Sequence, residues 1–208
     1  MTLPSIIHHY DTPHAPNPRR VRMFLAEKGV SFPTTPIDIM SGAQFEAHKA
    51  RVGTHHVPAF ELADGTYLTE TVAMCRYVEA LHPEPNLLGE DALEQARVEM
   101  WSRRVEFGLM MPIAAVLRHG NPKMAVMEQP QCPEWSAVNR PKVEAALVWL
   151  EESLRATPFL AGERFTLADI TALCSVEFMR TIRVPVPETH TATLEWHARL
   201  KARASYVP

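Results

Sequence analysis

Asn17 lies between two prolines at the start of a predicted helix, where its side chain could bind an anion. Pro18 disfavours a helical conformation at Asn17 and itself suits the first helical position, so the pair predicts Asn17 as the N-cap. The side-chain amide and the free N–H groups of the first turn could then hold an anion. The simpler interpretation is that Asn17 caps the helix and has no other role.

A thiolate is the natural anion for this position, because helix N-termini lower the pKa of thiols. A helix dipole worth ~0.3–1 kcal/mol and one charge-assisted hydrogen bond worth about 1.5–3 kcal/mol lower a thiol pKa by roughly one to two units. The cysteines of the chain lie elsewhere, at Cys75, Cys132 and Cys174. The thiol must therefore arrive with a ligand.

Two further residue pairs flank a predicted hairpin: Val57-Pro58 before it and Glu70-Thr71 after it. Pro58 fits an ordinary edge strand, or a cis bond that leaves the backbone of Val57 free to pair with a peptide-like ligand. Glu70 fits the dipole at a helix start. In the alternative interpretation, Glu70 binds a ligand ammonium, while the N–H and hydroxyl of Thr71 bind a ligand carboxylate. That arrangement would recognise the α-amino acid end of a ligand.

The periodicity of residues 1–82 changes repeatedly and predicts a small domain of strands and helices. We expect a strand over 5–10, a helix over 19–28 ended by Gly29, a strand over 36–39, a helix over 43–49, two strands over 57–62 and 66–68, and a helix carrying Met74, Val78 and Leu81. Asp64-Gly65 predicts the turn of the hairpin. The order β-α-β-α-β-β-α is too small for a dinucleotide-binding sheet and matches a thioredoxin-like domain.

Residues 83–91 are rich in proline and glycine and are predicted as a linker, and residues 92–208 as an all-helical domain. The expected helices cover 93–119 with a kink at Pro112, a segment through Leu154 that starts at Pro133 or at Pro141, a segment from Thr166, and 191–204. Thr166 and Asp169 match a capping box. The sequence does not decide between the two starts of the second helix.

Composition excludes several classes of protein. The chain has 208 residues and a formal net charge of −3, so neither disorder nor nucleic-acid binding is expected. The ten histidines include no HExxH motif, so no metal site is expected. The chain starts without a basic and apolar leader, and its longest apolar run, 109–117, is far short of the ~20 residues that span a membrane. Unpaired cysteines fit a cytoplasmic protein without a membrane segment.

Over essentially its whole length the chain resembles the bacterial cytosolic glutathione S-transferases. The matching segments are Ala-Pro-Asn-Pro-Arg-Arg-Val-Arg, His-Val-Pro-Ala-Phe, Glu-Thr-Val-Ala-Met-Cys-Arg-Tyr, the helix from Trp101, Phe-Leu-Ala-Gly-Glu-Arg-Phe-Thr-Leu-Ala-Asp-Ile and the helix through Trp196. The resemblance implies a glutathione-binding domain over 1–82, a helical co-substrate domain over 92–208, a homodimer and a role in detoxification.

Six residues receive a role in glutathione binding from this resemblance. The backbone of Val57, held by cis-Pro58, would pair with the cysteinyl unit, and Glu70 and Thr71 would hold the γ-glutamyl end. Gln44 and His56 match positions that often contact the glycyl carboxylate; solvated surface residues are the alternative.

The loop departs from the family pattern at Ala15, where the family places Ser, Cys or Thr just before Pro-Asn. Tyr10 and Thr12 are the nearby hydroxyls that could compensate. The Nu-type glutathione transferases, whose similar loop reads Thr-Pro-Asn and which act largely as disulfide reductases, suggest that Asn17 stabilises the thiolate. The predicted catalytic group is therefore Asn17 with the first-turn N–H groups, and glutathione is the nucleophile.

The sequence thus predicts a glutathione-dependent transferase or disulfide-bond reductase acting on a small hydrophobic electrophile or a disulfide. Ala15 also motivates an alternative, a binding or regulatory protein that keeps the transferase fold without turnover. A glutathione-dependent isomerase is a third hypothesis, but the Ser-rich, Cys-containing loop of the maleylacetoacetate isomerases is absent. Glutathione is the expected co-substrate, with no metal.

Overall fold

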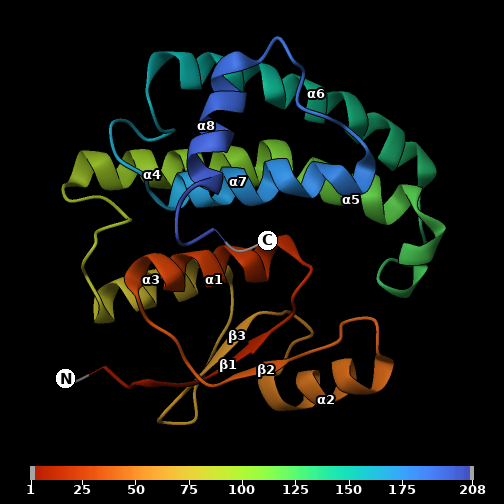
Figure 1. The fold of residues 1–208 in the computed structure, drawn as a ribbon. Helices are drawn as coiled ribbons and strands as arrows, with labels where there is room; N and C mark the ends of the chain where they lie inside the picture. The colour runs from red at the N-terminus through yellow and green to blue at the C-terminus, as the bar shows by residue number, and fades with distance from the viewer. Residues whose placement is uncertain (1–2, 207–208) are drawn as a thin grey trace. The chain divides into compact units, whose positions relative to one another are not determined.

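The computed structural model describes residues 3–206, and the chain divides into two compact units. The first unit comprises Met1–Asn86 and Ala204–Pro208, and the second comprises Leu87–Arg203 (Figure 1). The division thus falls inside the expected linker, 83–91, and the C-terminal residues group with the first unit rather than with the helical domain.

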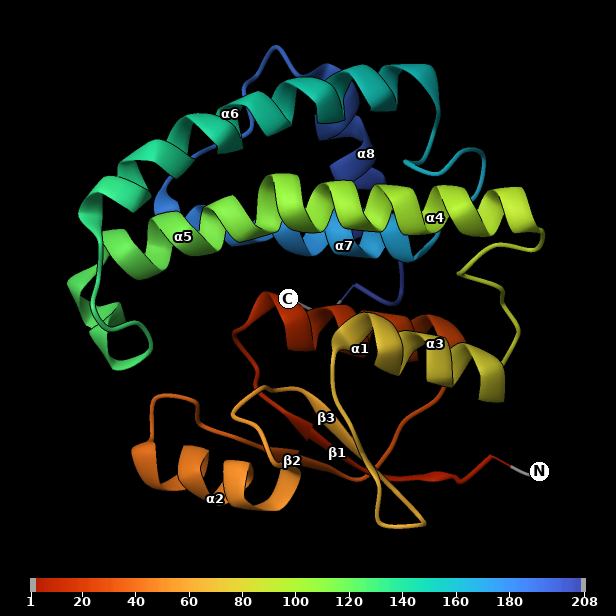
Figure 2. The same cartoon turned by 180° about the vertical axis from the view of Figure 1, so that it is seen from behind.

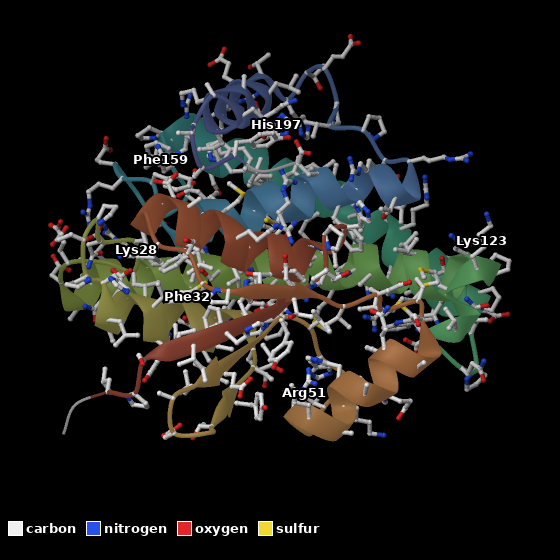
Figure 3. All side chains as sticks on the ribbon, turned by 60° about the horizontal axis from the view of Figure 1, so that its bottom comes forward. Lys28, Phe32, Arg51, Lys123, Phe159 and His197 are labelled. Carbon is white, nitrogen blue, oxygen red and sulfur yellow. The ribbon has the colours of Figure 1, made fainter. Side chains whose placement is uncertain are left out.

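Side-chain contacts explain why both ends of the first unit belong to it. Lys28, labelled in Figure 3, is 7% exposed and donates hydrogen bonds to the carbonyl oxygens of Pro83 (3.3 Å) and Pro85 (2.6 Å). Near the C-terminus, the Ser205 hydroxyl donates to the carboxylate of Glu27. These contacts join segments far apart in sequence, which local sequence patterns do not report.

The first unit has the predicted element order β-α-β-α-β-β-α. Its elements are β1 (Ile6–Asp11), α1 (Pro16–Lys28), β2 (Thr34–Pro36), α2 (Gly42–Val52), β3 (Ala59–Leu62), β4 (Tyr67–Leu68) and α3 (Thr71–Leu81). The sheet order is β2-β1-β3-β4, with β2 parallel to β1 and the other pairs antiparallel. Helices α1 and α3 lie side by side on one face of the sheet, and α2 lies on the other (Figures 1 and 2).

The hairpin prediction is confirmed, whereas the second strand begins earlier than expected. Gly65 takes φ 83° in the turn between β3 and β4, and the Asp64 carboxylate accepts the N–H of Thr66 at 2.9 Å. Strand β2 pairs with β1 from His9 opposite Thr34, so the predicted range 36–39 is about two residues late. The two β-branched threonines before Pro36 favour this extended pairing.

The second unit is helical, as predicted. Its elements are α4 (Ala92–Val105), the π-helix η1 (Glu106–Met110), α5 (Met111–Gly120), the 3₁₀-helix η2 (Pro122–Val126), α6 (Pro133–Ala156), α7 (Leu167–Phe178), the 3₁₀-helix η3 (Met179–Ile182) and α8 (Thr191–Lys201). Helix α6 starts at Pro133 and continues through Pro141, which resolves the open choice. Among the described residues, no helix combines the length and hydrophobicity needed to cross a bilayer.

The expected kink at Pro112 takes the form of a π-helical segment just before it. Pro112 lacks an N–H and cannot donate to the carbonyl of Gly108, the residue four positions earlier. The wider turn of η1 lies at this point and separates α4 from α5.

The capping box at the start of α7 is confirmed. The Thr166 side chain and the Asp169 side chain each bond to the other's backbone N–H. Asp169 is 0% exposed and also accepts hydrogen bonds from the N–H of Leu160 (3.0 Å) and from the indole of Trp196 (3.1 Å). Burial raises the pKa of Asp169 to about 6, although these hydrogen bonds act in the opposite direction. One carboxylate therefore joins α7, α8 and the loop before α7.

Candidate active site

Helix α1 begins at Pro16, so the prediction that Asn17 is the N-cap is wrong. Ala15 occupies the N-cap position with extended backbone (φ −99°, ψ 147°) and offers no side-chain cap, and Asn17 is the second helical residue. Pro16 carries the same helix-start preference as Pro18, and it also keeps the preceding Ala15 out of the helical region. The first of the two proline signals sets the start.

The two prolines leave few donors in the first turn of α1. Pro16 and Pro18 have no N–H, and the N–H of Arg19 donates to the carbonyl oxygen of Ala15 at 3.3 Å. The first turn therefore presents the backbone N–H of Asn17, together with its exposed side-chain amide. An anion at this helix end would meet donors from Asn17.

Neither candidate substitute hydroxyl extends the site. Tyr10 is 5% exposed, and its hydroxyl donates to the carboxylate of Glu61 at 2.7 Å. Burial, followed by this hydrogen bond, raises the pKa of Tyr10 to about 12. Arg51 of α2, labelled in Figure 3, lies over the Tyr10 ring at 5.3 Å. Thr12 is buried as well.

A hydrogen bond from helix α2 holds the loop before β3 in place. The peptide bond between Val57 and Pro58 is cis, and Pro58 is buried while Val57 is half-buried. His48 of α2 is 1% exposed, and its Nε2 lies 2.9 Å from the carbonyl oxygen of His56. A carbonyl oxygen only accepts, so His48 Nε2 is the donor. This bond fixes the backbone immediately before Val57.

Glu70 has a strained backbone directly before α3. Its φ of 63° and ψ of 108° lie outside the regions that non-glycine residues favour, and its side chain is exposed. The His56 Nδ1 lies 3.3 Å from its Oε1, which joins the loop before β3 to the start of α3. Strain kept at an exposed acidic residue points to a functional site.

The structure thus brings five predicted residues together: His56, Val57, Pro58, Glu70 and Thr71. Gln44 lies on α2, where its Oε1 accepts the N–H of Asp38 at 3.0 Å, and Asn17 lies on α1. Neither makes a hydrogen bond or ion pair to the other five within residues 3–206. Over the same residues, no cluster of three or more His, Cys, Asp or Glu side chains could hold a metal ion.

Comparison with known proteins identifies the family. The chain matches the N-terminal domain model of glutathione S-transferases over residues 14–81 and the C-terminal domain model over residues 133–199. Glutathione S-transferase 2 of Saccharomyces cerevisiae is 34% identical over 202 residues, which cover 94% of this chain and 86% of that protein. The chain belongs to the glutathione S-transferase family.

Solved structures of this family match the transferase over almost its whole length. A glutathione S-transferase domain-containing protein of Marinobacter aquaeolei VT8 is 35% identical with a TM-score of 0.91, covering 97% of this chain and all of that one. Gtt2 of Saccharomyces cerevisiae is 32% identical with a TM-score of 0.89, covering 96% and 98%. The thioredoxin-like fold, the helical C-terminal domain and a glutathione transferase-type function are therefore shown.

Sequence reasoning missed two buried residues of this transferase that contact the site. Arg20 is 0% exposed, and its Nη1 donates to the Thr71 hydroxyl oxygen at 2.6 Å. Arg20 precedes the buried Phe24 by four residues, and this spacing places both on the core face of α1. His48 is the second such residue, and it gives no comparable sequence signal because its partner is a backbone carbonyl.

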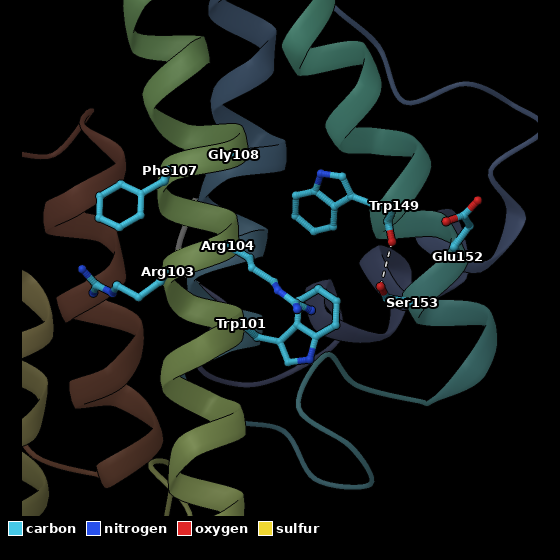
Figure 4. A pocket seen from close by; sticks show the side chains of 8 residues that line it. All are labelled: Trp101, Arg103, Arg104, Phe107, Gly108, Trp149, Glu152 and Ser153. Atoms are coloured by element: carbon cyan, nitrogen blue, oxygen red, sulfur yellow. Dashed lines mark hydrogen bonds between the residues drawn. The ribbon is translucent and has the colours of Figure 1, made fainter.

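The second unit of the transferase contains an open groove of about 680 Å³ (Figure 4). Helix α4 and the π-helix η1 form one side of the groove, and helix α6 forms the other. The Trp101 and Trp149 rings lie 6.0 Å apart, and the Arg104 guanidinium lies over Trp101 at 4.9 Å. Figure 4 shows Trp149 pointing from α6 toward α4, with Glu152 on the next turn of α6. The groove therefore combines an aromatic floor with charges of both signs.

Proposed function

We propose that the protein stabilises the thiolate of bound glutathione at the N-terminus of α1 and directs it at a small hydrophobic electrophile or a disulfide. With an electrophile, the sulfur forms a bond to carbon, the leaving group departs with its electron pair, and the thiol proton goes to solvent. With a disulfide, the sulfur bonds to one sulfur atom and releases the other as a thiolate. Both outcomes need the same activated nucleophile.

Glutathione binding uses the residues around the start of α3. Glu70 takes the ammonium of the γ-glutamyl group, and Thr71 takes its α-carboxylate. The N–H and carbonyl of Val57 pair with the cysteinyl backbone, and Gln44 and His56 serve the glycyl carboxylate. The strained backbone of the exposed Glu70 is the observation that most strongly supports this arrangement, because a fold has no structural reason to keep such strain there.

Asn17→Ala is expected to raise the pKa of the bound glutathione thiol by about one to two units, because one charge-assisted hydrogen bond worth about 1.5–3 kcal/mol is lost. The backbone N–H and the helix end remain, so the effect is partial. The measurement is a pH titration of the ultraviolet absorbance of the thiolate in the protein–glutathione complex, paired with the pH profile of kcat/KM for an electrophile and for a disulfide.

Asn17→Asp is the matched variant, since it keeps the size of the side chain and places a negative charge beside the thiolate. It should raise the thiol pKa further than alanine does. A bound thiol whose pKa is the same in all three proteins would contradict the role of Asn17. Glutathione binding without any turnover would instead favour the non-catalytic binding protein.

We propose further that the protein is a cytoplasmic homodimer in which the groove of one copy meets that of another. Cys75, Cys132 and Cys174 are not joined by disulfide bonds, which fits a reducing compartment. A two-fold interface pairs a surface with itself, so ion pairs across it need both charges on one patch. Arg104 and Glu152 line the same groove and supply them around an aromatic floor.

Arg104→Glu is expected to weaken the dimer by about 100-fold or more, because two acidic side chains would then face each other across the interface. Sedimentation velocity over a range of protein concentrations measures the effect. Glu152→Arg should weaken the dimer similarly, and the double variant should restore it. A double variant no more dimeric than either single one would contradict this interface.

A further inference from the structure

Arg20 places a positive charge inside the first unit. It lies on the core face of α1 with 0% exposure. Burying a guanidinium is strongly unfavourable unless its hydrogen bonds and neighbouring charges compensate. The identity of its partners therefore indicates what this buried charge is for.

One of these partners is the hydroxyl of Thr71, on the neighbouring helix α3. Arg20 Nη1 lies 2.6 Å from Thr71 Oγ1. A guanidinium has donors and no acceptor, so the hydroxyl oxygen must accept here and its hydrogen must point elsewhere. No acceptor for that hydrogen lies among the described residues. Arg20 thus fixes Thr71 as a hydrogen-bond donor with an open direction.

Thr71 offers a second donor at the same place. It is the first residue of α3, so its backbone N–H has no acceptor within the helix. Two donors on one residue match the two oxygens of a carboxylate, and both the helix N-terminus and the charge of Arg20 favour an anion. Thr71 is 8% exposed, so this interaction is partly shielded from water.

We propose that Arg20 is a positioning residue that orients and polarises the Thr71 hydroxyl toward the α-carboxylate of the γ-glutamyl group. This inference rests on the proposed function, in which Thr71 binds that carboxylate. Arg20 itself does not touch the ligand. Its contribution should appear only with ligands that carry the α-carboxylate, which separates it from a general role in folding.

The test compares two ligands: glutathione and γ-aminobutyryl-cysteinyl-glycine, in which hydrogen replaces the α-carboxylate. Affinities are measured by calorimetry, with displacement for the weaker ligand. The wild-type protein should bind glutathione at least 10-fold more tightly than the analogue. Arg20→Gln should weaken glutathione binding about 10-fold and leave the affinity for the analogue unchanged.

Arg76→Gln is the control, because it removes the same charge from an exposed position on α3 and should not alter the preference. Equal losses of affinity for both ligands in Arg20→Gln, or no loss for either, would overturn the inference. If the wild-type protein binds neither ligand, the proposed function fails and the inference fails with it.

Two variants of Thr71 keep the inference testable if Arg20→Gln does not fold, which circular dichroism would show. Thr71→Ser keeps the hydroxyl and should keep the preference for glutathione. Thr71→Val leaves Arg20 in place, removes the hydroxyl, and should reduce the preference about 10-fold. A Thr71→Val protein with the full wild-type preference would overturn the inference.

Discussion

Asp169→Asn is expected to lower the free energy of unfolding of the second unit by about 3–5 kcal/mol. The Asp169 carboxylate accepts the N–H groups of Leu160 and Trp196 at one oxygen and the N–H of Thr166 at the other. An asparagine has one acceptor oxygen, so in either orientation its amide N–H₂ faces a donor. At least one buried N–H loses its partner.

Chemical denaturation of the full chain near pH 8, about two units above the pKa of Asp169, measures the loss with the carboxylate ionised. Asp91→Asn is the matched control. Asp91 caps α4 by accepting the N–H groups of Leu93 and Glu94, but these contacts are exposed. Asparagine caps helices about as well as aspartate, so a change of only a few tenths of a kcal/mol is expected. Equal losses in the two variants would contradict the proposed role of burial.

The starts of α7 and α1 show when a helix boundary can be predicted from sequence. At α7, the cap Thr166, the acidic partner Asp169 and the flanking apolar residues all specify one position, and the prediction is confirmed. At α1, Pro16 and Pro18 give the same signal two residues apart. Local rules rank them equally, and the earlier one sets the start.

The proposed binding residues of the first unit show the same contrast between local and tertiary signals. Val57-Pro58 and Glu70-Thr71 are visible in the sequence because each is a local pattern at the edge of an element. The supporting side chains act through the tertiary fold. Arg20 contacts a residue that lies 51 positions further along the chain, and His48 contacts one that lies 8 positions further along. A periodicity argument places Arg20 on the core face but does not name its partner. The strain at Glu70 likewise needs coordinates.

Glu70→Gly is expected to weaken glutathione binding about 10- to 100-fold and still stabilise the protein. The loss follows because a charged hydrogen bond to the ligand ammonium is worth about 1.5–3 kcal/mol. The gain follows because glycine tolerates φ 63° and ψ 108°, which relieves strain of about 1–3 kcal/mol against a smaller entropic cost. The contact with His56 is highly exposed, so losing it matters little. Calorimetry and denaturation measure the two effects.

Two variants separate binding from strain. Glu70→Ala removes the same carboxylate and keeps a Cβ at the strained position, so it should lose the same affinity without gaining stability. Arg183→Gly relieves positive φ (56°) at an exposed residue of the second unit, so it should gain stability without losing affinity. Equal stability of the glycine and alanine variants at position 70 would show that no strain is stored there. Unchanged affinity in both would show that the carboxylate of Glu70 does not bind the ammonium, because the backbone conformation differs between them while the missing group is the same.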